Sequence, residues 1–104
     1  MTPLMPKTPS IHVETGKMGR IAYARIAPNE DLVRGIEKLC LSEGFDNAFV
    51  RGALGSLVDA CVMANDGNYI HVAGPAVEIV SIAGEVRSDN GVIEAYLSGV
   101  VADP

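Results

Sequence analysis

Three polar side chains in the sequence could bind a small ligand: Arg51, Tyr96 and Ser98. Tyr96 and Ser98 are separated by one residue within an apolar run, so in a β-strand they project from the same face and place a phenol beside a hydroxyl. Such a pair can hydrogen-bond a small polar molecule. Arg51 precedes a glycine-rich corner, where a guanidinium at a sheet edge could hold a carboxylate or a phosphate. We predict these three as the ligand-binding residues.

The same residues also have a purely structural interpretation. Tyr96 can pack its ring on the sheet with the hydroxyl at the rim, while Ser98 fills a small space. Arg51 can instead form an ion pair with an acidic side chain, the candidates being Asp59, Glu78 and Glu94. The ligand-binding and structural interpretations both stay open on the sequence alone.

We find no sequence motif of covalent, phosphate-binding or metal chemistry. G-x-S-x-G and GxxxxGK[ST] are absent, and the glycines of "GALGSL" lie between predicted strands rather than at the start of a helix. Cys40 and Cys61 occur without a CxxC or clustered histidines, which favours two buried thiols over a disulfide or a reactive cysteine. His71, in the polar segment 66–74, is expected to be an exposed loop histidine. We predict no catalytic residues, no metal and no cofactor.

The composition is typical of one soluble domain. The 104 residues are 48% hydrophobic, and no stretch approaches the ~20 apolar residues that a membrane span needs. Lys and Arg number 8 against 13 Asp and Glu, and the net charge of −5 repels nucleic-acid phosphates at long range. We expect a cytoplasmic protein without membrane contact, in which residues 1–10 form a disordered or extended proline-rich tail and residues 11–104 a single domain.

One helix is predicted between Pro28 and Gly44. Asn29 is a good N-cap, the acidic residues at 30 and 31 suit the first turn, and Gly44 suits the C-terminal end. Apolar residues at spacings of three and four form one buried stripe: Leu32, Val33, Ile36, Leu39 and Cys40. The charged residues that lie off this stripe are expected to be solvated: Arg34, Glu37, Lys38 and Glu43.

The segment preceding the helix has the alternation of β-structure. Gly16 and Gly19 divide "IHVETGKMGRIAYARIAP" into two short runs. The second run places Ile21, Tyr23 and Arg25 on one face. We therefore predict a short strand, a turn and a second strand before the helix.

After the helix, the sequence predicts one strand after another from Asn47 onward. The run at 75–86 is apolar on both faces over much of its length. Such a strand is expected inside a sheet, with the helix on one side and another surface, such as a second subunit, on the other. Asp89, Asn90 and Gly91 favour a tight hairpin turn.

Three phrases, in this order, resemble the PPC domain, the plant and prokaryote conserved domain often described as DNA-binding: "RIAPNEDLVRGIEKLCLSEGF", "AFVRGALGSLVDACV" and "VEIVSIAGEVRSDNGVIEAYLSGVVAD". The first resembles the family's strand, "EDL" and helix, and the second its Gly-Ala or Gly-Ser corner after a Val-rich strand. The third resembles its "EILSLSG" strand followed by a polar turn and a strand. The resemblance covers about Arg20 to Asp103.

The resemblance implies an α+β fold, with one main helix packed across a curved antiparallel sheet, and assembly as a homotrimer. In the plant proteins the DNA-binding label belongs to an AT-hook outside the domain, and no Arg-Gly-Arg-Pro segment occurs here. A Gly-Arg-Phe-Glu-Ile-Leu stretch that the plant domain uses for partner binding matches residues 75–80, which lack the Arg and the aromatic residue. DNA and that partner interaction are therefore disfavoured.

The resemblance also bears on metal binding and on the C-terminus. Several prokaryotic members resemble metal binders with a His-x-His pair in a late strand, and the matching positions here are Tyr96 and Ser98, which are poor zinc ligands. The family continues beyond Asp103 with further strands. We therefore expect a truncated domain or a shortened variant, whose exposed edge is covered by a neighbouring subunit or by further residues.

Two functions follow as hypotheses. The leading one is a non-enzymatic, oligomeric PPC-type module of a prokaryote, a DNA-binding or regulatory protein by family description, with a role in assembly or regulatory binding. The alternative is a small-molecule-binding protein or an enzyme that uses a cleft between subunits around Arg51, Tyr96 and Ser98.

Overall fold

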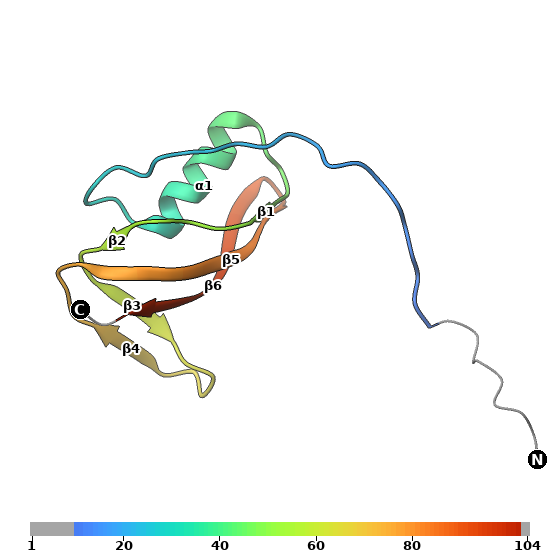
Figure 1. The fold of residues 1–104 in the computed structure, drawn as a ribbon. Helices are drawn as coiled ribbons and strands as arrows, with labels where there is room; N and C mark the ends of the chain where they lie inside the picture. Colours follow the sequence, from blue (N-terminus) through green and yellow to red (C-terminus); the bar gives the residue numbers. More distant parts are fainter. Residues whose placement is uncertain (1–9, 103–104) are drawn as a thin grey trace, which may run out of the picture.

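The structure is a computed structural model that describes residues 10–102. Within this range lie one helix and six strands (Figure 1): α1 (Leu32–Glu43), β1 (Ala48–Val50), β2 (Ser56–Leu57), β3 (Ala60–Met63), β4 (Tyr69–Val72), β5 (Val77–Asp89) and β6 (Val92–Ala102). The predicted α+β class, with one main helix on an antiparallel sheet, is confirmed. The predicted tail lies outside the described residues except for Ser10.

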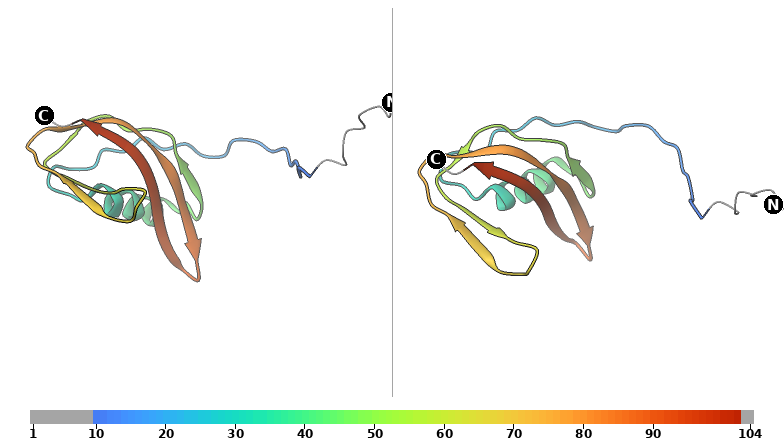
Figure 2. Two further views of the ribbon diagram at one scale, coloured as in Figure 1. Left: turned by 90° about the horizontal axis from the view of Figure 1, so that it is seen from below. Right: turned by 60° about the horizontal axis from the view of Figure 1, so that its bottom comes forward.

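The larger sheet is organised around β5. On one side β5 pairs along its whole length with β6, and on the other side its two halves pair with β2 and β1, all antiparallel. The β5–β6 hairpin is long and curved (Figure 2). Its turn is the predicted one, because Asp89 pairs with Val92, and Asn90 and Gly91 adopt φ angles of 51° and 79°.

The core lies between α1 and the inner face of the larger sheet, and most of its buried side chains come from β5. Val77, Ile79, Ile82 and Val86 are buried there. A register shift between Ile79 and Ser81 inserts one extra residue, Val80, which is 61% exposed. Only one face of the predicted two-faced apolar run is therefore covered by the part of the chain that the structure describes.

The helix ends where predicted but begins later. Asp31, not Asn29, is the N-cap, and its Oδ1 accepts a hydrogen bond from the Arg34 N–H at 2.9 Å. Asn29 has a φ of 67° in the turn that follows Pro28, so its side chain is not in the capping position. The prediction of Asn29 as N-cap is wrong, and no acidic residue lies in the first turn, but the Asp31 carboxylate does place negative charge at the N-terminal end of the helix. Gly44 closes the C-terminus with a φ of 74°, as predicted.

The strands predicted before α1 are absent from residues 10–27, which are extended and unpaired. The second part of this segment runs along α1 instead. Arg20 Nη1 donates to the Glu43 carbonyl at 2.8 Å, and Ile26 packs against the buried Gly35. An alternating sequence forms a strand only when a partner strand lies beside it, and this segment lies beside a helix.

The segment 66–74 was predicted as a loop but contains β4, which pairs with β3 in a separate two-stranded sheet. Two hydrogen bonds from Asn68, from its backbone N–H and its side chain, close the connecting turn and lower the pKa of Asp66. His71 is exposed as predicted, but on a strand. Cys40 is buried, whereas the prediction that Cys61 is buried is wrong, because it lies on the open face of this small sheet.

Candidate functional site

The sheet face turned away from α1 carries two of the predicted site residues. Along β6 the exposed residues alternate with less exposed ones, so Tyr96 and Ser98 share this outer face. The register places Tyr96 opposite Glu85 of β5, and Glu85 opposite Phe49 of β1. Phe49, Glu85 and Tyr96 therefore form one row across three strands, and Ser98 lies in the next row.

This outer face is hollowed into a groove of about 870 Å³. Its apolar wall includes Phe49, Val92 and Tyr96, and its charged wall includes Glu85, Arg87 and Glu94. Phe49 is 79% exposed and Tyr96 54%, so both aromatic rings are accessible. A ligand in the groove would meet exposed aromatic rings beside a mainly acidic wall.

Four polar side chains of the groove form two pairs. Arg87 Nη2 lies 2.9 Å from Glu85 Oε1. The Tyr96 hydroxyl donates a hydrogen bond to Glu94 Oε2, and this bond, followed by the carboxylate's charge, raises the pKa of Tyr96. Tyr96 therefore stays a neutral donor whose hydroxyl is already engaged.

The structure does not gather the three predicted site residues into one pocket of a single chain. Tyr96 lines the groove, whereas Arg51 and Ser98 do not. Arg51 is exposed just after β1 and makes no ion pair within residues 10–102. Two of its predicted partners have other neighbours: Asp59 Oδ1 lies 3.7 Å from His71 Nε2, and Glu94 accepts a hydrogen bond from the Tyr96 hydroxyl. The ligand-binding role of the three residues stays a prediction.

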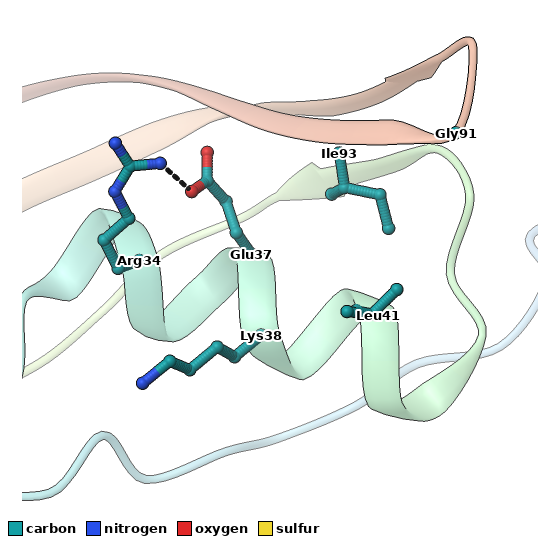
Figure 3. Close-up of a pocket in the computed structure, with 6 residues that line it drawn as sticks. All are labelled: Arg34, Glu37, Lys38, Leu41, Gly91 and Ile93. Atoms are coloured by element: carbon teal, nitrogen blue, oxygen red, sulfur yellow. Dashed lines mark hydrogen bonds and ion pairs between the residues drawn. The ribbon is translucent and has the colours of Figure 1, made fainter.

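A second groove, which sequence reasoning missed, lies between α1 and β6 (Figure 3). It measures about 200 Å³ and is lined by Arg34, Glu37, Lys38, Leu41, Gly91 and Ile93. The expectation that Glu37 is solvated is wrong, because its side chain is only 13% exposed. The signal available in the sequence was the spacing of three between Arg34 and Glu37, which places opposite charges side by side on a helix.

Glu37 connects the helix to the edge of the sheet. Its Oε1 accepts from Arg34 Nη1 at 2.9 Å, and its Oε2 accepts from the backbone N–H of Ala95 at 2.9 Å. That N–H therefore points away from β5. Because backbone groups in an antiparallel strand alternate between its two sides, the N–H groups of Leu97, Gly99 and Val101 point the same way.

β6 is consequently an edge strand. Over its 11 residues it pairs with β5 alone among the described strands. Glu37 covers one backbone donor at Ala95, and the outward N–H and C=O groups of Leu97, Gly99 and Val101 have no hydrogen-bond partner among residues 10–102. An uncovered edge of this kind is a template for another strand.

Among residues 10–102, no group of three or more His, Cys, Asp or Glu side chains is placed to hold a metal ion. α1, the helix of the described range, is neither long nor apolar enough to cross a membrane.

Comparison with known proteins identifies the family. The chain matches the Plants and Prokaryotes Conserved (PCC) domain over residues 13–104, and it belongs to this family. The resemblance of the three sequence phrases to the PPC domain is thereby confirmed. No curated protein and no solved structure matches the chain significantly.

Proposed function

We propose that this PCC domain is a non-enzymatic module that assembles as a homotrimer and serves a regulatory binding role in the cytoplasm of a prokaryote. The observation that carries the proposal is the unpaired edge of β6. Soluble proteins shield long edge strands, because exposed backbone donors and acceptors pair with other chains. A second copy of the chain provides that shield.

The outer face of the sheet supports assembly in the same way. Phe49, Val80, Tyr96 and Val100 are all more than half exposed on or beside this face. Contiguous exposed apolar surface on a soluble protein marks an interaction site. A neighbouring subunit would remove this surface and the β6 edge from water together.

DNA is not the proposed partner. The groove wall carries more acidic than basic side chains, and the whole chain has a net charge of −5. Affinity for DNA comes largely from neutralising its phosphates, and this surface repels them.

Mass in solution tests the assembly directly. Light scattering at micromolar concentration should give about three times the chain mass of 10.9 kDa. A clean monomer would remove the trimer. A mobility-shift titration at two salt concentrations should show no salt-dependent DNA binding tighter than about 10⁻⁴ M, since even non-specific binders exceed that affinity. Tighter, salt-sensitive binding would restore DNA as a partner.

The second candidate function is binding of a small molecule, or an enzymatic reaction, in a cleft between subunits. It is favoured by three exposed polar side chains, Arg51, Tyr96 and Ser98, of which Arg51 has no ion-pair partner in the described range. A small carboxylate such as succinate, or inorganic phosphate, should then raise the melting temperature of the assembled protein. Arg51→Gln should abolish that rise, and an equal rise in the variant would exclude Arg51.

A further inference from the structure

We propose that copies of this chain associate head to tail through β-strand addition. The extended segment Ile21–Arg25 of one copy pairs with the free edge of β6, at Leu97–Val101, of the next copy. This inference rests on the proposed assembly and names the two surfaces that produce it.

The receiving surface is the part of β6 that the helix leaves open. Glu37 occupies the edge at Ala95, where its carboxylate already accepts the outward N–H. From Leu97 onward no side chain of the described range hydrogen-bonds the outward backbone groups. Leu97–Val101 is long enough for a short strand, and strands of this length are common.

The donated surface is the segment whose alternation predicts a strand that a single chain does not form. Tyr23 is 98% exposed, and Ile21 is also exposed. The backbone of Ile21–Arg25 makes no hydrogen bond to the described part of its own chain. The segment is held extended at both ends, by Arg20 at the end of α1 and by Ile26 against Gly35. Because it is already extended, pairing costs it less conformational entropy than a free arm would lose.

Pairing within one chain is prevented by the helix between the two surfaces. Ile26 packs on α1 at Gly35, while β6 is bonded to α1 at Glu37. Positions two residues apart on an α-helix differ by about 200° around its axis, so the two surfaces lie on opposite sides of α1. Two different surfaces on opposite sides of one molecule join copies head to tail, and such contacts form a ring when the rotation between neighbouring copies closes.

Charge complementarity favours a second copy as the occupant. Residues 17–25 contain Lys17, Arg20 and Arg25 and no acidic residue. The β5–β6 hairpin contains one basic side chain, Arg87, against four acidic ones: Glu78, Glu85, Asp89 and Glu94. A basic strand added beside an acidic hairpin is attracted to it, and salt weakens that attraction.

Proline substitutions test the pairing, because proline removes a backbone N–H. Neighbouring N–H groups of a strand point to opposite sides, so Ala22→Pro with Tyr23→Pro removes the pairing donor whichever way the segment faces. Glu14→Pro with Thr15→Pro is the matched control in the same unpaired segment. Val101→Pro blocks the β6 edge, where the lost N–H points away from β5.

Light scattering of the full chain should give an assembly for the wild type and the Glu14/Thr15 control, and a mass near 10.9 kDa for the Ala22/Tyr23 and Val101 variants. A one-to-one mixture of these two variants should recover a species of twice the chain mass, because each retains one intact surface. Arg25→Glu, which carries no proline, should weaken assembly at least about tenfold. Circular dichroism checks that each variant is folded.

Four results would overturn the inference. If the Ala22/Tyr23 variant assembles as well as the wild type, another surface joins the copies and the proposed assembly stands without this pairing. A mixture that stays monomeric, or Arg25→Glu assembling like the wild type, also excludes the head-to-tail contact. A monomeric wild type would remove both the contact and the proposed assembly.

Discussion

The two faces of the larger sheet, formed by β1, β2, β5 and β6, are built from neighbouring residues of the same strands but lie in different environments. The inner face, under α1, buries Val77 and Val86 almost completely. The outer face leaves Phe49 and Tyr96 largely in water. Both faces carry apolar side chains, so hydrophobicity alone does not distinguish them.

This difference shows which part of the sequence maintains the fold and which part is free for binding. The inner face fills the space beneath the helix, and its side chains contribute the free energy of folding. The outer face contributes little to the stability of one chain, since its side chains stay exposed. Its exposed apolar side chains are the ones that the proposed assembly would cover.

The largest expected effect comes from truncating the inner face. Val86→Ala should lower the free energy of unfolding by about 2–3 kcal/mol, because it opens a cavity in a packed core. Phe49 follows Ala48, the residue of β1 that pairs with Val86, and its side chain lies on the outer face. Phe49→Ala should change the free energy of unfolding of the monomer by no more than about 0.5 kcal/mol. Urea denaturation measures both, and equal losses would mean that the two faces do not differ as described.

The next effect tests the bond between the helix and the edge of the sheet. Glu37→Ala should cost about 1–2 kcal/mol, because it removes the acceptor of the Ala95 N–H and the partner of Arg34. Lys38→Ala, at an exposed position on the same helix, is the control and should be close to neutral. If the two variants are equally stable, Glu37 does not hold α1 to β6.

A smaller effect tests where the covering helix begins. Asp31→Ala should destabilise the protein by about 1 kcal/mol, since the N-cap carboxylate would be lost. Glu30→Ala, one residue earlier, should have almost no effect. Thermal denaturation of the two variants measures the difference. If Glu30→Ala is the less stable variant, Asp31 is not the N-cap.

The smallest effect belongs to the outer face and concerns the titration of Tyr96. Its pKa is raised because its hydroxyl donates to the Glu94 carboxylate, which opposes formation of the phenolate. Glu94→Gln removes that charge, so Tyr96 should ionise at a lower pH in the variant. Near-ultraviolet absorbance followed against pH measures this, and an unchanged titration would show that the hydroxyl is not bound to Glu94.

The parts of the fold that could be predicted from sequence are those set by local signals. The end of α1 at Gly44 and the turn at Asn90 and Gly91 follow from backbone preferences of a few adjacent residues. The start of α1 could not be predicted as well, because Asn29 and Asp31 are both good caps. In the structure Asn29 has a left-handed φ of 67°, whereas an N-cap residue has an extended backbone, so the cap is Asp31.

The features that could not be predicted depend on which elements become neighbours. The alternation around Tyr23 indicates a strand but does not reveal whether another strand lies beside it. The burial of Glu37 depends on β6, far away in sequence, reaching the helix. The alternation of β-strand side chains correctly predicted that Tyr96 and Ser98 share one face. That Arg51 does not line the groove could not be predicted, because it depends on the tertiary structure.

Amide hydrogen exchange along β6, followed at low and high protein concentration, tests the central claim that this edge is an assembly surface. The account predicts that the outward amides of Leu97, Gly99 and Val101 exchange quickly when the chain is dilute and become protected as it associates. The Ala95 amide, bonded to Glu37, should be protected at both concentrations. Association that leaves the three outward amides exchanging as fast as in the dilute chain would contradict the account.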